Sequence, residues 1–448
     1  MKMKKPLRAS TIIASLLVWQ PLLADTNSHT PSITSVTDEI GKVLHPTKDI
    51  AYIPYVFSSD STGFSGGLSV IKQGFLQPQT TAIATLFYGT SQDIVTNNRE
   101  DTANFSGGFA TIIDYLVPGS DRLLFSAVGM KSYFPKARYY MYDRSNDSDE
   151  NNYVETSGDA DFIYTTLKYV LPMGDGLDNP VGHYTLDEGF ALRREHYGGG
   201  MPFVTGRTSL GISTFYEHNS FDNHLIGSPH ASIGLTSWDT NGLRFFVEHD
   251  NTDYDLNPSR GYQFKLQYSR DFGWADSDQS WDFLEFKYNH YINLPTFSFT
   301  KQNVLAMSFW TAYSFSWEED SDLLDNHRPP PWEGARLGGL FRMRAYDQNR
   351  FSDKSAVYGT AEYRAILNWN PFKRNEYLPV AVDWLQVVGF VEAGRVHDTY
   401  NPDLLTDMKY DVGISLRMMA AQVPVRFDVA YGDEGTNFWV MVFQPFDF

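Results

Sequence analysis

One stretch of the chain gathers side chains that could support hydrolysis or bind a transition metal. His218, His224 and His230 lie near Asp222 and Ser228. A Ser-His-Asp hydrolase needs these residue types in mutual contact. The six-residue spacing of the histidines fits no standard metal-binding pair. We therefore interpret the three histidines as solvated loop residues, and we expect no catalytic residue, no metal site and no cofactor.

Composition limits the classes of function that the chain can have. Its 448 residues are 15% aromatic, include no cysteine and carry a formal net charge of -18. The aromatic content allows a large buried surface and excludes global disorder. Without cysteine there is no disulfide framework and no thiolate chemistry. The acidic balance argues against nucleic acid as a partner, because phosphate neutralisation needs a basic face.

Residues 1–24 have the pattern of a secretory signal peptide. Basic residues such as Lys2 and Arg8 come before the apolar run 11–19, and Leu22-Leu23-Ala24 fits a cleavage site. The apolar run is about half as long as a membrane-spanning helix needs. The sequence therefore predicts an exported protein. Residues 25–49, rich in Ser, Thr and Pro, are expected to form a short periplasmic linker or a plug segment.

Alternation of polar and apolar residues predicts β-strands. Aromatic and apolar residues alternate with polar ones from 262 to 269 and again from 284 to 289. A helix with 3.6 residues per turn would scatter both sets around its circumference. After residue 24 no apolar run reaches 18 residues, so helical membrane spans are not expected. In a transmembrane barrel only every second residue meets lipid, which agrees with a mean hydropathy of -0.35.

Strand length favours a transmembrane barrel over a soluble β-sandwich. Runs such as 102–114, 204–216 and 303–315 are longer than an average globular strand and long enough to cross hydrocarbon when tilted. Aromatic residues cluster at the ends of these runs, as interfacial girdles do. About seventeen runs are recognisable, but single-chain barrels have an even number. We assign the weakest run, 231–238, to an outer loop. The prediction is an all-β fold, a transmembrane antiparallel β-barrel of 16 strands over residues 50–448.

The connections between the runs differ in length. Residues 117–120 and 257–261 contain the Pro and Gly of tight inner turns, whereas 146–159 and 317–351 are long enough for outer loops. The glycine-rich stretch 174–200 is either a long inner connection or a misplaced strand.

The insert 317–351 carries the most specific signal. It resembles the sixth outer loop of the BamA/TamA family of outer-membrane barrels, the bacterial surface antigen superfamily, whose tip has a Val-Arg-Gly-Phe/Tyr motif. The resemblance implies a long outer loop that is folded into the barrel lumen. Ala345 stands where the family has Gly, and its Cβ restricts a positive φ. The residues that carry the resemblance are Gly338, Gly339, Met343, Arg344, Ala345 and Tyr346.

The resemblance also implies partners for Arg344. A guanidinium inside the lumen needs anions to offset its desolvation, and the family supplies them from the strands after the loop. Glu362 and Glu392 lie in those segments here, on the polar faces of their strands. We expect both glutamates to bind Arg344.

Two further segments extend the resemblance over most of the chain. Asp253, Pro258 and Gly261 match the family's inner hairpin, although Thr252 stands where Arg is usual. The chain closes with an aromatic run, in which we expect Phe446 and Phe448 to end the last strand. Residues 25–49 are too few for the POTRA repeats that BamA and TamA carry before the barrel. The resemblance is thus to a short member without these repeats, and docking of substrate through them is in doubt.

Two functions from different classes follow from the resemblance. The first is insertion of outer-membrane proteins or translocation, through a lateral seam between a first strand near Tyr52 and a last strand near Trp439. The partners would be outer-membrane lipid, lipopolysaccharide and an unfolded outer-membrane protein client, and the barrel would be monomeric. The alternative is a diffusion channel or structural barrel, in which the loop merely plugs the lumen. An enzyme at the barrel rim is a distant third.

Overall fold

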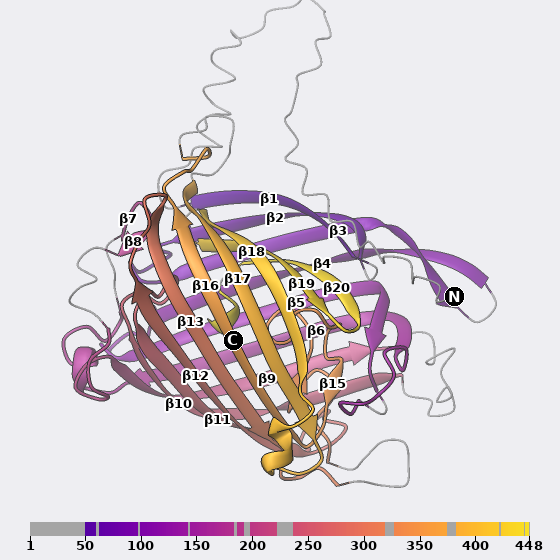
Figure 1. Ribbon diagram of the computed structural model, residues 1–448. Helices are drawn as coiled ribbons and strands as arrows, with labels where there is room; N and C mark the ends of the chain where they lie inside the picture. The colour runs from indigo at the N-terminus through magenta and orange to yellow at the C-terminus, as the bar shows by residue number, and fades with distance from the viewer. Residues whose placement is uncertain are drawn as a thin grey trace, which may run out of the picture.

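The computed structural model describes residues 50–59, 62–96, 99–141, 144–182, 186–191, 198–221, 236–318, 327–373, 382–420, 423–442 and 444–447. Sixteen of its strands form one antiparallel sheet that curves into a nearly closed barrel (Figure 1). The prediction of an all-β barrel with 16 strands is therefore confirmed. In sheet order the strands are β1 (Ile50–Ser59), β2 (Gly63–Gln73), β3 (Thr81–Thr96), β4 (Arg99–Leu116), β5 (Leu123–Tyr139), β6 (Val154–Val170), β9 (Arg207–Ser220), β10 (Ser237–Thr252), β11 (Gly261–Asp271), β12 (Trp281–Leu294), β13 (Thr300–Tyr313), β16 (Ser355–Leu367), β17 (Val382–His397), β18 (Lys409–Ala420), β19 (Val423–Gly432) and β20 (Gly435–Val442).

The barrel wall is apolar outside and polar inside, the reverse of a soluble protein. On β18, Val412 and Ile414 are exposed by 51% and 64%, whereas Asp411, Ser415 and Arg417 are buried. Successive side chains of a strand point to opposite faces of the sheet, so the first set faces outward and the second faces the lumen. This alternation is the pattern of a wall that meets lipid on one side and polar groups on the other.

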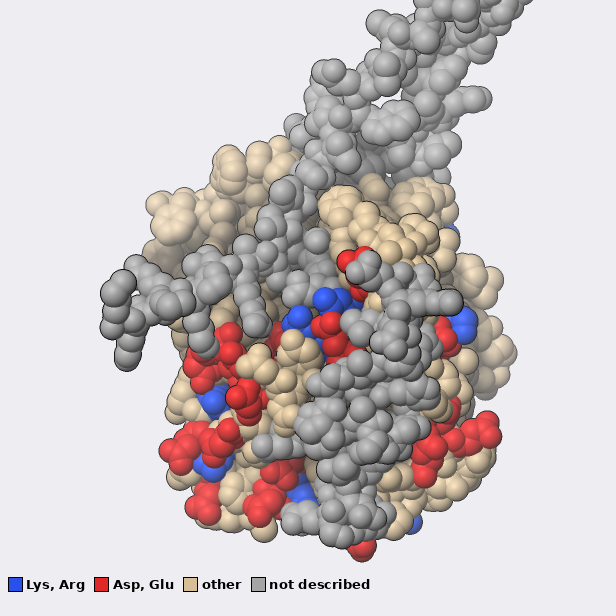
Figure 2. Space-filling view, turned by 90° about the vertical axis from the view of Figure 1, so that its right-hand side faces the viewer, with Lys and Arg blue, Asp and Glu red and all other residues tan. Residues whose placement is uncertain are grey.

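Most connections agree with the lengths expected from the sequence, but the outer loop expected at 146–159 is shorter, because residues 154–159 already belong to β6. Short turns join β4 to β5 and β10 to β11 at one end of the barrel, which we call the inner end. The long insert between β13 and β16 lies at the other, outer end and contains the two-stranded pair β14 (Arg336–Leu337) and β15 (Phe351–Ser352). Acidic side chains gather towards the outer end, while the wall above it is largely uncharged (Figure 2).

The stretch 174–200 is an inner connection between β6 and β9, not a misplaced wall strand. Its described part contains the short helix η1 (Gly174–Gly176) and the pair β7 (Leu186–Asp187) and β8 (Phe190–Ala191). The connection crosses the inner mouth, because Arg122, just before β5, donates to the Gly176 carbonyl while Trp384 on β17 donates to the Gly189 carbonyl.

Two assignments near the chain's uncertain stretches need comment. Of the run 231–238, assigned above to an outer loop, residues 231–235 lie outside the described part, but Ser237 and Trp238 already belong to β10. The prediction is wrong by two residues because alternation is the only sequence signal for the start of this strand. The expected signal peptide 1–24 and the linker or plug 25–49 also lie outside the described residues. Among the residues that the structure describes, no helix has the length and apolar character to cross a membrane.

The sheet has two free edges. Its strand order runs from β1 to β20, and within the described residues no ladder joins these two strands (Figure 1). Near the inner end, side chains cover part of this gap, because Val423 on β19 packs in one cluster with Ile71 on β2 and Ile83 on β3. We call the boundary between β1 and β20 the seam.

The alternation on β18 makes a depth-dependent prediction. Ile414→Arg places a charge in the middle of the lipid-facing side and is expected to lower the free energy of unfolding by about 2–4 kcal/mol. Tyr410→Arg, on the same face near the outer end of the strand, is expected to cost only about 0–1 kcal/mol. Urea unfolding in lipid vesicles, followed by tryptophan fluorescence, measures both. Equal costs for the two variants would show that this face does not span a bilayer.

Candidate functional site

The insert between β13 and β16 turns back on itself around two glycines. Gly338 and Gly339 have φ values of +103° and +109°, which side chains rarely adopt. A Cβ on Gly338 would lie 2.3 Å from the Asp347 carbonyl oxygen. The Gly339 N–H donates to the Tyr346 carbonyl at 3.1 Å, which closes the tip of the insert. The glycine pair thus builds the sharp turn that brings the tip, residues 343–346, into the lumen.

Arg344 is fully buried at this tip and bound by three carboxylates. Its Nη2 donates to Glu362 Oε1 at 2.9 Å, and its Nε donates to Glu392 Oε1 at 3.1 Å. Its Nη1 donates to Asp428 Oδ2 at 3.1 Å. The backbone N–H of Arg344 adds a 2.7 Å bond to the second oxygen of Glu392, and the guanidinium lies 3.4 Å from the centre of the Phe390 ring. The tip is therefore tied to β16, β17 and β19 at once.

The surroundings of Arg344 keep it charged. Burial by itself would lower the pKa of Arg344, but the charges of Glu392, Glu362 and Asp428 outweigh burial and raise this pKa well above its ordinary value. Removing ions from water costs several kcal/mol each, and charge-assisted hydrogen bonds of good geometry offset that cost. Tyr358 donates a further 2.5 Å hydrogen bond to Glu392. The site is a rigid ionic lock between loop and wall.

Three more arginines extend this ionic network along the lumen. Arg364 and Arg417 both donate to Glu362, at 2.8 Å each, and Arg426 pairs with Asp428. All three side chains are buried. The sequence places each on the polar face of its strand, so their inward direction follows from alternation, but their number around Glu362 does not.

The tip adopts a backbone conformation that needs no glycine at position 345. Met343, not Ala345, takes the left-handed conformation, with a φ of +57°. The Ala345 N–H donates to Asp411 at 3.0 Å, and its carbonyl accepts from Asn437 on β20 at 3.0 Å. Ala345 also fits closely against Gly432, where a Cβ would lie 3.0 Å from the alanine Cβ. The close approach on β19 is thus provided by Gly432, while Ala345 keeps an ordinary φ.

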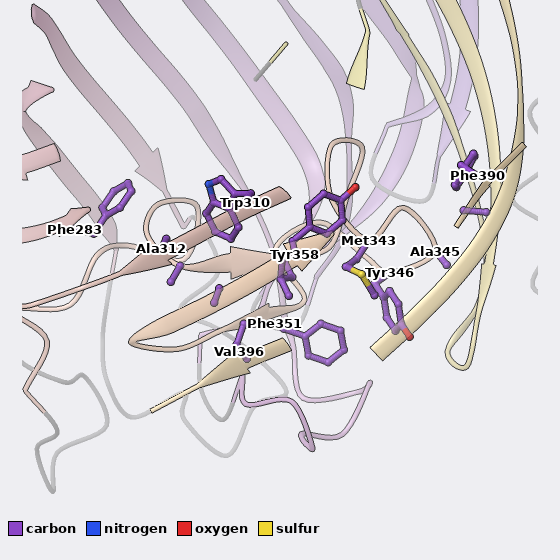
Figure 3. Close-up of a cluster of buried hydrophobic side chains, with 14 of the residues drawn as sticks. Phe283, Trp310, Ala312, Met343, Ala345, Tyr346, Phe351, Tyr358, Phe390 and Val396 are labelled. Carbon is purple, nitrogen blue, oxygen red and sulfur yellow. The ribbon is translucent and has the colours of Figure 1, made fainter. Parts of the chain in front are cut away.

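The residues on either side of Arg344 attach the loop differently. The Tyr346 hydroxyl donates to Asp433 Oδ1 at 2.5 Å, and burial and this bond raise the pKa of Tyr346 above its ordinary value. Met343 lies beside Tyr346 and belongs to the buried cluster that also includes Phe351 and Phe390 (Figure 3). Arg342, by contrast, stacks 3.8 Å from the Trp310 ring, and burial lowers the pKa of Arg342 to about 10. Of Arg342 and Arg344, only Arg344 is bound by carboxylates in the described structure.

The inner turn between β10 and β11 is held by its aspartate. Asp253 accepts hydrogen bonds from the Ser259 N–H at 2.7 Å and from the Arg260 N–H at 3.2 Å. Gly261 has a φ of +98°, and a Cβ there would lie 2.0 Å from the Asn251 carbonyl oxygen. Pro258 lies in the same turn, between the aspartate and the glycine. These contacts explain the hairpin as a structural element.

The expected end of the last strand is wrong for Phe446. β20 ends at Val442, and Phe446 lies in the short helix η5 (Pro445–Asp447), where it is buried. Pro445 has no N–H to continue a ladder, so the wall stops before it. Phe448 lies outside the described residues.

The described residues show no arrangement that favours a hydrolase site or a metal site at the three histidines. His218 Nδ1 lies 2.8 Å from Asp239 on the neighbouring strand, and His224 and His230 lie outside the described residues, as do Asp222 and Ser228. Within the described part of the chain no group of three or more His, Asp or Glu residues could hold a metal ion. The segment 63–67 matches Gly-x-Ser-x-Gly. However, it lies within strand β2, and its Ser65 donates to the Thr62 carbonyl.

Sequence reasoning missed several partners of the tip. They include Asp428 on β19, Asp411 on β18 and Trp439 on β20, the last of which donates to the Arg344 carbonyl at 2.7 Å. Strand parity gave a usable signal for both aspartates, because each alternates with outward apolar residues. Nothing in the sequence indicates the Trp439 contact.

A sixteen-stranded barrel with an arginine-tipped loop locked to luminal carboxylates defines a class of outer-membrane barrels with an inward-folded surface loop. The chain belongs to the Omp85 superfamily, because the model of the Omp85 superfamily domain matches residues 55–440. This is a family of outer-membrane transporters and insertases. The resemblance to BamA/TamA barrels is thereby confirmed.

Solved structures similar to this chain have low sequence identity to it, and the one with a TM-score above 0.5 supports the barrel fold. CdiB from Escherichia coli has a TM-score of 0.53 and 11% identity, over 89% of this chain and 62% of that chain. CdiB from Acinetobacter baumannii has a TM-score of 0.48 and 12% identity, over 88% and 58%. BamA from Haemophilus ducreyi lacking POTRA domains 1–3 has a TM-score of 0.44 and 12% identity, over 88% and 69%. The chain thus spans less than two thirds of either CdiB protein. A comparison with curated proteins finds no match.

Arg344→Ala is expected to lower the free energy of unfolding by about 3–5 kcal/mol, because it leaves buried carboxylates without their counter-ion. Arg342→Ala is the matched control and is expected to cost about 1 kcal/mol, the value of its contact with the Trp310 ring. The temperature at which each variant loses its heat-modifiable migration on gels measures the difference, and we expect a lower temperature for Arg344→Ala than for Arg342→Ala. If both variants behave alike, the lock at Arg344 does not determine stability.

Proposed function

We propose that this barrel inserts outer-membrane proteins into the membrane, or translocates them, at the seam between β1 and β20. The observation that carries the proposal is the absence of a ladder between these strands in the described residues. A free strand edge presents a row of unpaired N–H and C=O groups and is a template for another strand. An unfolded outer-membrane protein would pair its strands with this edge before it leaves the barrel.

The two sides of the seam are held differently, which suits this role. On the β20 side, Trp439 and Asn437 bind the loop tip through the carbonyls of Arg344 and Ala345. β20 is thus attached to the ionic lock as well as to β19. β1 pairs only with β2 in the described sheet. The β1 edge is therefore the side that we expect to move.

The proposed setting is a single barrel in outer-membrane lipid with lipopolysaccharide on its outer side, acting on an unfolded outer-membrane protein client. Membership of the Omp85 superfamily supports a location in the outer membrane. The outward apolar faces of strands such as β18 support direct contact with lipid. No step of the proposal requires catalysis.

A diffusion channel is the second candidate. The observation in its favour is a cavity of about 1090 Å³ at the inner end of the lumen, lined by charged residues that include Lys168, Glu248 and Lys265. The inner connection between β6 and β9 limits access to this cavity, since its residues 180–182 line it. The outer half of the lumen is filled by the insert and its ionic lock.

Depletion of the protein from its host separates the two functions. Under the proposal, the amounts of folded outer-membrane proteins fall several-fold, while an Arg344→Ala copy restores them less well than a wild-type copy. Quantitative gels of heat-modifiable outer-membrane proteins give the measurement. Unchanged protein levels together with slower uptake of small solutes would reject insertion and favour the channel.

The inner connection gives a test of the channel candidate by itself. Gly189 has a φ of +75°, and a Cβ there would meet Trp384 Nε1 at 2.8 Å, so Gly189→Val is expected to displace this connection. Single-barrel conductance in planar bilayers should then rise at least two-fold. Gly199→Ala is the matched control, because Gly199 has a φ of +80° with nothing near its Cβ position. Equal conductance in both variants would show that the connection does not limit access.

A further inference from the structure

The chain that follows β20 enters the lumen. Gln444, Pro445 and Phe446 are all buried, and we call these three residues the luminal segment. Phe446 lines both the large inner cavity and a small cavity beside Phe341 and Arg342 of the insert. The luminal segment therefore lies between the inner cavity and the folded loop.

The far wall of the barrel binds Phe446. Its ring packs in one cluster with Tyr291 on β12 and with Val304 and Ala306 on β13. Five strands separate β12 from β20 along the sheet. Because the segment begins next to β20, it must cross the lumen to reach this cluster.

Polar groups on the same wall bind the main chain of the segment. The Phe446 carbonyl accepts hydrogen bonds from Lys287 and, at 3.1 Å, from Asn289 Nδ2, both on β12. The Arg364 guanidinium lies 4.7 Å from the centre of the Phe446 ring, and neither of its Nη atoms has a hydrogen-bond partner in the described residues. The wall thus offers an apolar socket, two donors for one carbonyl and a cation over the ring.

Gln444 makes the second attachment. Its Oε1 accepts from Arg417 Nη1 at 2.6 Å, and its Nε2 donates to the Leu256 carbonyl of an inner turn at 3.4 Å. Arg417 also binds Glu362, the carboxylate that holds Arg344. The luminal segment is therefore connected through one arginine to the ionic lock.

This crossing constrains the seam. The segment starts two residues after the end of β20, so its attachment to the far wall holds the inner end of β20 inside the lumen. At the start of the neighbouring strand β19, the Val423 side chain packs across the seam with Ile71 and Ile83 of β2 and β3. A strand whose end is held inside the lumen cannot lie along β1, whose N–H and C=O groups it would otherwise satisfy.

We propose that the luminal faces of β12, β13 and β16 form a peptide-binding site for the luminal segment, and that its occupation keeps the inner end of β20 off β1. The ligand class is a short peptide stretch that presents an aromatic ring and its own main-chain carbonyl. Release of the segment lets β20 pair with β1 and close the barrel. The regulatory meaning of the site rests on the seam function proposed above, but the binding itself does not.

Disulfide cross-linking across the seam tests the proposal, and the chain has no cysteine of its own. Val440→Cys places a thiol on the outward face of β20, and a second cysteine replaces Tyr52, Pro54 or Val56 on the outward face of β1. A disulfide needs Cα atoms roughly 4.4–6.8 Å apart, close to the spacing of paired strands. Yield on a non-reducing gel therefore reports pairing, and no client protein is involved.

In this background, Phe446→Ala and Lys287→Ala should each raise the cross-link yield several-fold. Phe446→Ala removes the ligand, Lys287→Ala removes a donor of the site, and the double variant should exceed neither single one, as expected for two halves of one contact. Phe438→Ala, on the outward face of β20, and Lys265→Ala, the cross-strand neighbour of Lys287, are matched controls with unchanged yield.

Heat-modifiable migration confirms that each variant is folded before its yield is compared. Parental yields in both folded test variants would overturn the proposal, as would an equal rise in Lys265→Ala. Unchanged outer-membrane protein levels after depletion would reject the seam function instead, and would leave the cross-linking result standing.

Discussion

The structure depends on the burial of one guanidinium. Arg344 sits where no water can replace lost hydration, so the fold has to supply anions at fixed positions around it. Glu362, Glu392 and Asp428 come from three different strands, and their positions fix how β16, β17 and β19 stand relative to one another. Glycine turns and aromatic packing in the insert then serve to bring the arginine there. Loop position and wall geometry are thus determined by the same contacts.

Much of the wall could be predicted from the sequence, because a barrel has a strict physical rule for each strand. Residues such as Val412 and Ile414 meet lipid, and residues such as Asp411 and Arg417 do not. This rule gave about seventeen candidate strands, which the even strand number of single-chain barrels reduced to sixteen, and it gave the inward direction of Glu362 and Glu392. It depends only on neighbours along the chain, which is the information that a sequence contains.

The rest could not be predicted because it depends on contacts between distant strands. Asp428 and Asp411 have the right parity, but so do other luminal carboxylates, and alternation gives no distance to Arg344. The left-handed φ lies at Met343 instead of position 345, and Ala345 packs against Gly432, which lies in another strand. The inward course of Phe446 has the same origin. From the sequence alone, an aromatic residue that follows a strand is interpreted as part of that strand. The contacts of Phe446 with the far wall become evident only in the structure.

The ionic lock and the seam differ in how their polar groups are satisfied. In the lumen, Arg344 and the three carboxylates around it form ion pairs that tie the insert to β16, β17 and β19. At the seam, two strands keep backbone groups without a ladder, a state that a closed sheet would remove. Such a gap persists only if other contacts oppose its closure. On the β20 side, Trp439 and Asn437 bind the loop tip and the luminal segment binds the far wall, whereas β1 is hydrogen-bonded in the described sheet only to β2. The contacts of β20 with the loop tip therefore position one edge of the seam, and the edge of β1 has no such contact with the insert among the described residues.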